Sequence, residues 1–450
     1  MKRLLIVFLL MLLSPLLSAG EAEYSRQLMR EQASLFILAQ QDKASPLLPL
    51  MQSFELTEDA LERDYQTLKA EWLRYGIEPG NASGSSLSSR LIALEPNSQY
   101  LALMNEIRQL LWQEGANWQV IEIEGVLRPG NNHKTVPLLA HKLTLSGDLS
   151  GASVSSATYQ GQLVEAVKRF QRRHGLKDDG AVGEKTLHWL NLHPREKAQM
   201  LTRNYLLQSA EFLAMPSSMV LVNIPAFELT LYNDGKQVLQ SRVIVGKPSR
   251  KTPVLESEIS AVVVNPSWRV PRRLVRYDVL PKLREDAHYL SSKGFIVWDR
   301  QGQMINETDE FYQQAAHGKF PYLLEQRPGP ENALGRFKLF FANDDSVYLH
   351  DTPDKGLFKK SMRALSSGCV RVEKIAELAN WLARERVTDP RLWQSSVNTP
   401  ERTQWFRLET RLPVRFVYWT SWIDNNGKAQ FRDDVYDIRK DNQLVAQRTP

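Results

Sequence analysis

The sequence predicts a multidomain α+β protein with a helical N-terminal half and a β-rich C-terminal half. Its 450 residues are enough for roughly two to four domains of ordinary size. Apolar residues recur with helical spacing before about residue 215, and they alternate with polar residues from about Ser217 onward. A hydrophobic content of 42% and a charged content of 24% are globular values. These patterns indicate packed domains of both kinds in one chain.

The N-terminus has the order of a secretory signal peptide. Lys2 and Arg3 precede an apolar run from Leu4 to Leu17, and small residues follow to Gly20. We therefore expect residues 1–20 to direct export of a mature body without a later membrane span. The run is shorter than the roughly 20 residues that span a bilayer comfortably. A retained membrane anchor stays the alternative to cleavage.

A helical scaffold is predicted for residues 21–125, and residues 193–216 are expected to return to it. Leu28, Leu35 and Leu38 share one face of the first helix, and two further helices cover Ala60–Tyr75 and about Gln99–Trp112. The Pro/Gly/Ser-rich stretch from Pro79 to Ser89 is expected to be a loop.

Residues 126–192 are predicted to form a separate three-helix domain. Leu163, Val167 and Phe170 recur at a spacing of four and three on its second helix, which ends near Gly175. Gly175 stands where a helix C-cap glycine belongs, and Gly180 suits a tight turn. The aliphatic positions are expected to be core rather than ligand contacts.

A mainly-β domain is predicted for residues 217–430, followed by a tail at 431–450. Its sequence alternates, and Asn233-Asp234-Gly235 is a hairpin turn signal. A helical insertion is expected from Arg272 to about Tyr322. A helix from Ile375 to Glu385 and a last strand in the segment LPVRFVYWTSWID complete the domain.

Charge and cysteine content narrow the function classes. The net charge of +6 suits an anionic polymer or surface, but no Lys/Arg block of the nucleic-acid type appears, so nucleic acid is not an expected partner. No metal-ligand spacing or phosphate-binding glycine loop is present, so neither metal nor organic cofactor is expected. Cys369 is the one cysteine, which excludes an internal disulfide. A lone exported thiol is either buried and inert or used chemically.

The segment from Tyr348 to Val372 carries the candidate chemistry. A strand delivers His350, and a polar loop leads to Ser366-Ser367-Gly368-Cys369-Val370-Arg371. Acyl transfer by cysteine needs a thiolate, which an adjacent imidazole can generate. Gly368 permits close backbone approach near an oxyanion, and the Arg371 guanidinium can bind a carboxylate. By itself, a histidine at a strand end is more often structural. Asp351 beside it is expected to stabilise the turn.

This segment resembles the active-site signature of the L,D-transpeptidases, in which a histidine precedes Ser/Thr-x-Gly-Cys-x-Asn/Arg. The resemblance implies that Cys369 is the nucleophile, His350 the general base, Gly368 the shaper of the oxyanion site and Arg371 a substrate-binding position. Ser366 begins the motif, and Ser366 and Ser367 are expected to support the oxyanion site beside Gly368. Most members have histidine where this chain has Ser367, so any second role of that histidine is unsupported. The run AVKRFQRRHGLKDDGAVGEKTLHWL likewise resembles the peptidoglycan-binding domain of wall enzymes; a three-helix bundle without binding function is the alternative.

The segments NPSWRVP and RPGPENALGRFKLFF resemble the large periplasmic branch of that family. The resemblance implies a helical scaffold, a peptidoglycan-binding domain and a catalytic domain with a cap inserted at about residues 268–330. The cap is either a mobile lid over the thiol or a rigid excursion. Trp268, near the cap hinge, is the tryptophan most suited to substrate contact.

The function implied by the resemblance is a periplasmic, wall-associated cysteine acyltransferase that forms 3→3 cross-links between peptidoglycan stem peptides. Cys369 would expel D-alanine from a tetrapeptide donor, and the thioester would pass to an amine of a second stem. Carbapenems are expected to acylate the same thiol, and wall synthases are possible partners. Hydrolysis of the thioester (an L,D-carboxypeptidase), attachment of a lipoprotein and a non-catalytic wall-binding scaffold remain alternatives.

Overall fold

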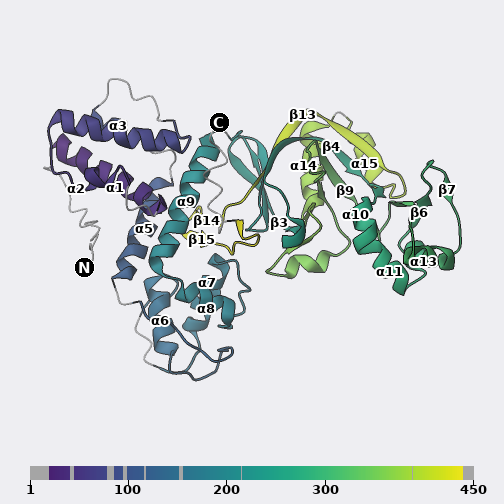
Figure 1. Cartoon of the computed structure of the whole chain (residues 1–450), viewed down its shortest axis with the longest axis horizontal. Helices are drawn as coiled ribbons and strands as arrows, with labels where there is room; N and C mark the ends of the chain where they lie inside the picture. Colours follow the sequence, from purple (N-terminus) through teal and green to yellow (C-terminus); the bar gives the residue numbers. More distant parts are fainter. Residues whose placement is uncertain are drawn as a thin grey trace. The chain divides into compact units, whose positions relative to one another are not determined.

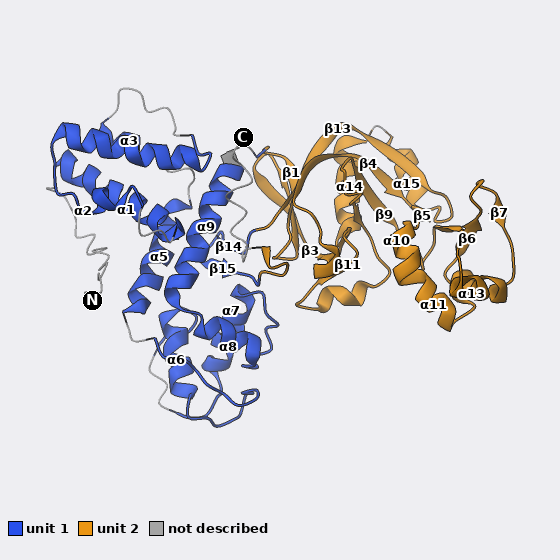
Figure 2. Ribbon diagram, in the orientation of Figure 1, with its two compact units in different colours: residues 1–215, 419–433 blue, residues 216–418, 434–450 orange. Residues whose placement is uncertain are grey.

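The computed structural model describes residues 20–40, 45–78, 86–94, 99–115, 118–151, 156–213, 215–387 and 389–438. The expected signal segment up to residue 19 and residues 439–450 of the expected tail at 431–450 lie outside these ranges, as does most of the expected loop at 79–89. The chain forms two compact units (Figure 2). Unit 1 comprises residues 1–215 and 419–433, and unit 2 comprises residues 216–418 and 434–450. Within the described ranges, no helix combines the length and apolar character needed to cross a bilayer.

The scaffold part of unit 1 is helical, as the periodicity predicts. Its core includes the T-shaped pair of Phe36 and Trp72, whose ring centroids lie 4.8 Å apart. The buried Gln32 accepts a hydrogen bond from the Trp72 indole and donates one to the Leu91 carbonyl. The last helix of this part packs against the first and the fifth (Figure 1). The scaffold helices are α1 (Glu21–Gln40), α2 (Leu48–Gln52), α3 (Glu58–Arg74), α4 (Leu87–Ile92), α5 (Tyr100–Glu114) and α9 (Pro194–Leu213).

Three helices of unit 1 lie where the sequence predicts the small bundle: α6 (Val136–Leu145), α7 (Gln162–Arg173) and α8 (Glu184–Asn191). Leu163, Val167 and Phe170 are buried in the core of unit 1. His174 ends α7, and Gly175 follows with a φ of 64°, which confirms the C-cap prediction. Gly180 has a φ of 75° in the turn before α8.

The hairpin of β14 (Ser421–Ile423) and β15 (Ala429–Phe431) corrects the expected domain boundary, because it belongs to unit 1 and not to the β-rich unit. The Phe431 ring stacks on His174 with centroids 5.3 Å apart. Arg173 donates to the Ala429 carbonyl at 2.9 Å, and the Trp189 indole donates to Asp433 at 2.9 Å. These contacts join positions more than 240 residues apart, so no local pattern signals them.

The main sheet of unit 2 closes on itself. Its strand order is β11-β3-β12-β10-β9-β4-β13-β1-β2, and β2 also pairs with β3. The turn between β2 and β3 has positive φ at Asp234 and Gly235, as the hairpin signal predicts. The strands are β1 (Met219–Asn223), β2 (Glu228–Asn233), β3 (Lys236–Gly246), β4 (Leu255–Val264), β9 (Phe337–Phe341), β10 (Leu349–His350), β11 (Ala364–Ser366), β12 (Val370–Val372) and β13 (Gln404–Val417).

One face of this sheet carries the core of unit 2. Val220, Leu339, Leu349 and Val370 are fully buried there. The helix α14 (Ile375–Arg386) packs on this core through Leu378 and neighbouring apolar residues, and α15 (Pro390–Val397) follows it. Side chains at alternate strand positions, such as His350, point to the other face.

The inserted segment has its own sheet and core, so the expected helical insertion is only partly helical. The strands β5 (Trp268–Arg269), β6 (Phe295–Trp298), β7 (Met304–Ile305) and β8 (Leu323–Gln326) pair in the order β5-β8-β6-β7. A π-helix at Val275–Val279 lies between α10 (Arg272–Leu274) and α11 (Leu280–Glu285). The remaining helices are α12 (Tyr289–Ser292) and α13 (Asp309–His317). The strands are two to four residues long, too short for alternation to show in the sequence. We call residues 268–326 the cap.

Candidate active site

Three adjacent strands of unit 2 place the candidate residues on one sheet face. β10 pairs in parallel with β12, which sets His350 opposite Arg371, and pairs antiparallel with β9, which sets His350 opposite Lys338. The intervening Leu349 and Leu339 are fully buried in the core. Because side chains alternate along a strand, Lys338, His350 and Arg371 form a row on the opposite face.

Cys369 lies beside Tyr348 on that same face. The Val370 amide donates to the Tyr348 carbonyl at 3.1 Å, which brings the residue before β12 next to the residue before β10. Hydrogen bonding from the Tyr348 side chain lowers the pKa of the Cys369 thiol, and the sulfur lies 3.9 Å from the Ser346 carbonyl oxygen. The rings of Tyr348 and His350 meet edge to face with centroids 5.4 Å apart. Tyr348 therefore contacts both members of the expected catalytic pair.

The electrostatics of the site keep both members of that pair neutral at neutral pH. Burial raises the pKa of the Cys369 thiol, although hydrogen bonding to Tyr348 and the charges of Lys338 and Arg371 oppose this rise. Burial, assisted by Arg371 and Lys338, lowers the pKa of His350 to about 3. The groups that lower the thiol pKa thus do not include His350, which the sequence analysis expected to generate the thiolate.

The imidazole nevertheless has the protonation state that a general base requires. His350 is 5% exposed, and its Nδ1 atom is buried without a hydrogen-bond partner among the described residues. A neutral imidazole has a free lone pair that can accept a proton at the moment of attack.

The turn before the cysteine is fixed by side-chain hydrogen bonds. The Ser366 hydroxyl accepts from the Gly368 amide at 3.2 Å and donates to the Cys369 carbonyl at 2.5 Å. Thr252 donates to the Gly368 carbonyl at 2.7 Å, and Gly368 has a φ of 123°, which favours glycine. Ser366 thus holds the turn. The Gly368 amide is engaged by Ser366 and would have to exchange this partner to hold an oxyanion.

Ser367 connects the cap to residues 366–369, which we call the thiol loop. Its hydroxyl accepts from Arg250 at 2.8 Å and lies 3.4 Å from the Asp278 carboxylate. Arg250 and Asp278 form an ion pair at 2.5 Å, and Asp278 belongs to the π-helix of the cap. The sequence analysis missed Arg250 and Asp278, because the contacts join residues 89 and 117 positions from Ser367.

Arg371 is half-buried and is already bound within the chain. One guanidinium nitrogen lies 3.4 Å from both the Thr352 hydroxyl and the Asp354 carboxylate. Its Nε atom is buried and has no partner among the described residues. Because Asp354 is largely exposed, a substrate carboxylate could exchange with it at modest cost.

Asp351 has the turn-stabilising role that the sequence analysis expected. Its carboxylate accepts from the Arg336 amide at 2.9 Å and from the Thr352 amide at 2.7 Å, and Lys355 forms an ion pair with it. These contacts fix the start of the loop that follows His350.

The sequence analysis also missed Tyr348 and Lys338. The Lys338 ammonium lies 3.8 Å from the centroid of the Tyr348 ring, and the Tyr348 side chain is hydrogen-bonded to Trp268 at the start of the cap. A contact therefore runs from the cap through Tyr348 to the thiol. The available signal was Tyr348 two residues before His350, on the same face of the strand.

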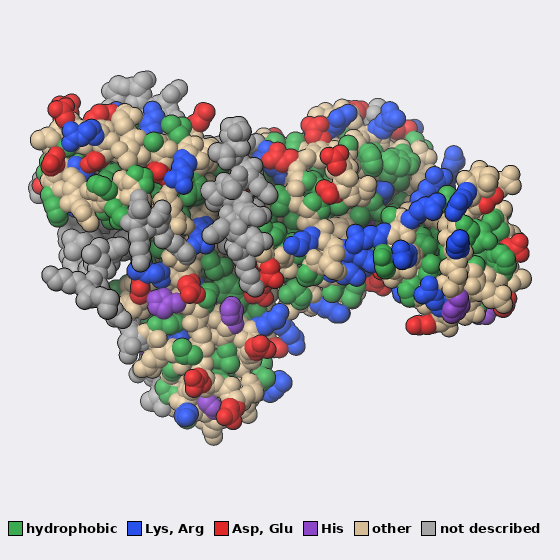
Figure 3. All heavy atoms as spheres, in the orientation of Figure 1, with side chains coloured by type: hydrophobic (Ala, Val, Ile, Leu, Met, Phe, Trp, Pro, Cys, Tyr) green, Lys and Arg blue, Asp and Glu red, His purple; other side chains and the backbone are tan. Residues whose placement is uncertain are grey.

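The cap presents a basic surface. Figure 3 shows Lys and Arg side chains gathered over the region of α10. Arg272, Arg273 and Arg276 are all exposed there. In the described part of the chain, no group of three or more His, Cys, Asp or Glu side chains is placed to hold a metal ion.

Comparison with known families identifies both domain types. Residues 217–401 match a family described as "L,D-transpeptidase catalytic domain", and residues 132–190 match one described as "Putative peptidoglycan binding domain". The stretch 217–401 contains the whole sheet face described above. Residues 217–401 are therefore similar to the L,D-transpeptidase catalytic domain, and residues 132–190 are similar to a peptidoglycan-binding domain.

A curated protein of Haemophilus influenzae described as "Putative L,D-transpeptidase" is 38% identical over 246 residues, which cover 54% of this chain and 49% of that protein. The chain thus spans about half the length of the curated relative it matches. A solved L,D-transpeptidase from Mycobacterium smegmatis is 13% identical, with 45% of this chain and 58% of that one covered and a TM-score of 0.23. Mycobacterium tuberculosis L,D-transpeptidase 1 is 15% identical, with 45% of this chain and 61% of that one covered and a TM-score of 0.18. Scores this low carry no argument about activity.

Proposed function

We propose that the chain is an exported peptidoglycan L,D-transpeptidase that forms 3→3 cross-links through a thioester on Cys369. The thiol attacks the carbonyl of the third residue of a tetrapeptide stem, and its proton passes to His350. The bond to the terminal D-alanine breaks, and His350 returns the proton to the leaving amine. The side-chain amine of a second stem then attacks the thioester, gives its proton to His350 and regenerates the thiol.

The observation that carries this proposal is the shared face of His350, Tyr348 and Cys369 in a domain similar to the L,D-transpeptidase catalytic domain. A neutral imidazole can take the thiol proton during attack, so that no standing thiolate is needed. The exposed arginines of the cap suit the carboxylates of stem peptides. The substrate would be met in the periplasm, and no metal or organic cofactor takes part.

The proposal is tested by incubating the purified chain with disaccharide-tetrapeptide and analysing both products and intact protein mass. We expect released D-alanine, cross-linked dimers and a transient adduct on Cys369. Cys369→Ala should abolish all three, and Ser291→Ala in the cap serves as a folded control. Dimers formed by Cys369→Ala would refute the proposal. Disaccharide-tripeptide without dimers would instead support the carboxypeptidase alternative, and a carbapenem should leave a stable adduct on the same thiol.

A further inference from the structure

A buried pocket in unit 1 lies outside the site described above. It is lined by residues of the scaffold, of the three-helix bundle and of β15, including Trp118, Lys142, Phe170, His174, Lys197 and Phe431. Its volume of about 20 Å³ leaves room for one small polar group. Buried pockets of this size are expected to be apolar or to hold matched polar groups, and the charged side chains that line this one are Lys142, Arg173, Lys197 and one carboxylate, Glu106.

Lys197 is the least compensated of these cations. Its side chain is 6% exposed, and its ammonium has no hydrogen-bond or ion-pair partner among the described residues. The nearest aromatic ring, that of Phe170, has its centroid 5.4 Å away. Lys197 also stands in the first turn of α9, where the helix dipole adds positive potential.

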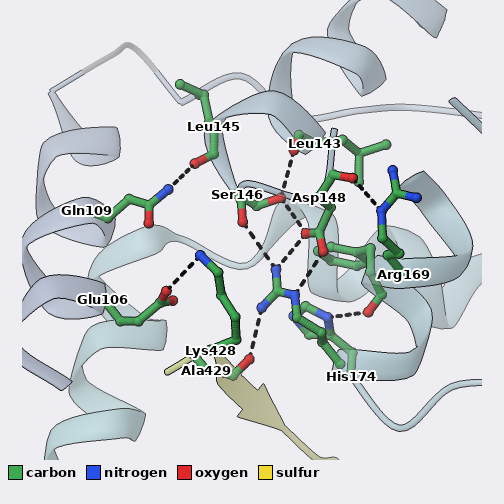
Figure 4. Close-up of polar contacts among 12 residues, drawn as sticks. Glu106, Gln109, Leu143, Leu145, Ser146, Asp148, Arg169, His174, Lys428 and Ala429 are labelled. Carbon is green, nitrogen blue, oxygen red and sulfur yellow. Dashed lines mark hydrogen bonds and ion pairs between the residues drawn. The ribbon is translucent and has the colours of Figure 1, made fainter. Parts of the chain in front are cut away.

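Lys142 is a second cation of the same pocket, and His174 is a neutral neighbour, because burial lowers the pKa of its imidazole well below the ordinary value. Lys142 is 2% exposed and donates to the Leu190 carbonyl at 3.0 Å, while its ammonium lies 3.7 Å from the centroid of the Trp118 ring. His174 donates through Nδ1 to the Phe170 carbonyl at 2.7 Å, and its Nε2 atom is buried without a partner in the described structure (Figure 4). Burial lowers the pKa of Lys197 to about 7 and that of Lys142 to about 8.

The carboxylates near the pocket are already paired. Asp148 binds Arg173 at 2.5 Å and accepts from Ser146, and Glu106 binds Lys428 at 3.3 Å, as Figure 4 shows. Neither is an ion-pair partner of Lys142 or Lys197. A buried ammonium without an anion is costly, and an anion supplied from outside the chain would offset this cost for both lysines that line the pocket.

We propose that this pocket binds a carboxylate group, with the Lys197 ammonium as its principal partner and Lys142 as the second cation. Lys142 already donates to the Leu190 carbonyl and to the Asn191 side chain, so the carboxylate supplies the acceptor that Lys197 lacks and an anion for both lysines. It is borne either by a small free acid or by a larger ligand that inserts only this group. A peptidoglycan stem peptide is the larger source that suits a peptidoglycan-binding domain, and this last point rests on the proposed function.

The first experiment measures thermal unfolding of the full chain with sodium acetate or with acetamide, its uncharged analogue, at constant ionic strength. Acetate should raise the melting temperature and acetamide should not. Lys197→Met should melt higher than the wild type without ligand, because an unpaired buried charge is gone, and should lose the acetate shift. Lys197→Gln should lose the same shift, which guards against a misfolded variant.

Lys177→Met is the matched control, since it removes the same charge from an exposed ion pair of unit 1. It should keep the full acetate shift. An equal shift in wild type and Lys197→Met, an equal effect of acetate and acetamide, or no shift with either compound would overturn the proposal.

The second experiment identifies the source of the carboxylate by calorimetric titration in a Cys369→Ala background, so that binding is measured without turnover. Disaccharide-tetrapeptide that binds at least tenfold more tightly than acetate, and loses this advantage when its carboxyl groups are amidated, identifies the stem peptide. Equal affinity for both identifies a free small acid. Both titrations are repeated with Lys197→Gln added to the Cys369→Ala background, and only binding that this second substitution weakens is assigned to the pocket. Failure here and failure of the transpeptidase assay are therefore distinguishable.

Discussion

The Tyr348 ring packs edge to face on His350, and hydrogen bonding from the same side chain lowers the pKa of the Cys369 thiol. The thiol and the imidazole thus share one neighbour, and that neighbour is also hydrogen-bonded to Trp268 of the cap. The cap is therefore connected to the surroundings of the sulfur through Tyr348 as well as through the contact of Asp278 with Ser367.

Tyr348→Phe should make the thiol less reactive. The hydrogen bond from the hydroxyl lowers the pKa of Cys369, so its loss should raise that pKa further. Hydrogen bonds to charged groups contribute about 1.5–3 kcal/mol, which corresponds to a loss of about tenfold or more in alkylation rate at neutral pH. Iodoacetamide kinetics measure this effect. Tyr312→Phe, at another buried tyrosine of unit 2, is the control and should leave the rate unchanged.

His350→Gln should separate thiol reactivity from acyl transfer. The pKa of His350 is about 3, so the imidazole stays neutral from pH 5 to 8 and its protonation should leave no step in the alkylation profile there. The profile should rise with pH and should be nearly the same in His350→Gln. Transpeptidation should fall by about 10²- to 10⁴-fold, as expected for loss of a general base. A step near pH 6.5 that the variant abolishes would show that the imidazole controls the thiolate instead.

Asp278→Asn should loosen the cap from the thiol loop. The carboxylate pairs with Arg250 and lies near Ser367, and such a partly exposed ion pair contributes about 0.2–1 kcal/mol. Access of a bulky disulfide reagent to Cys369 should therefore rise by about two- to fivefold. Glu325→Gln is the control, because it removes the charge from another ion pair of the cap, with Arg269, and should not change access. Unchanged access in Asp278→Asn would mean that this ion pair does not restrain the cap.

Gly335→Ala should be far more destabilising than Gly302→Ala. Both glycines have positive φ, 59° and 82°, so each substitution costs about 1–2 kcal/mol in backbone strain. A Cβ at Gly335 would also lie 2.5 Å from Asp351, whereas one at Gly302 meets open space. Overpacking adds about 1–3 kcal/mol at Gly335 alone. Urea unfolding measures the loss in free energy of unfolding for each variant. Equal losses would show that the loop after His350 moves enough to accommodate the added Cβ.

Lys197→Met should flatten the pH dependence of stability in mildly alkaline solution. The folded pKa of about 7 lies below the ordinary value of 10.5, so between these values the unfolded chain binds more protons than the folded one. The free energy of unfolding should therefore rise with pH, by up to about 1.4 kcal/mol per pH unit from this lysine. In the variant, the contribution of Lys197 to this slope should be absent, whereas that of Lys142 should remain. Denaturant unfolding at several pH values with a ligand-free buffer measures both slopes.

Sequence patterns within a few residues correctly predicted the turns and helix ends that such short segments determine. The Asn233-Asp234-Gly235 turn and the Gly175 C-cap each follow from glycine and asparagine chemistry within a few residues. The pairing of β14–β15 with the three-helix bundle could not be predicted, because it depends on contacts such as Arg173 with Ala429. The short strands of the cap were missed because a two-residue strand shows no period.

The residues of the candidate site likewise fall into two groups, those found from the local sequence and those that only the fold brings to the site. His350 and Cys369 were found from residue type and spacing, and Asp351 from strand alternation. Lys338, Arg250 and Asp278 enter only through the register of β9 and the placement of the cap. Tyr348 lay within the motif, but its contact with the sulfur depends on the parallel pairing of β10 and β12.

The passage of the chain out of unit 2 at residue 418, through unit 1, and back at residue 434 has a consequence for modularity. A stop codon or protease cut at the end of β13 would remove Phe431 and Asp433 from the bundle, although that bundle is complete in the preceding sequence. Neither unit can be transplanted, duplicated or expressed as one uninterrupted gene fragment with all its native packing. Recombination is therefore expected to exchange the two units together.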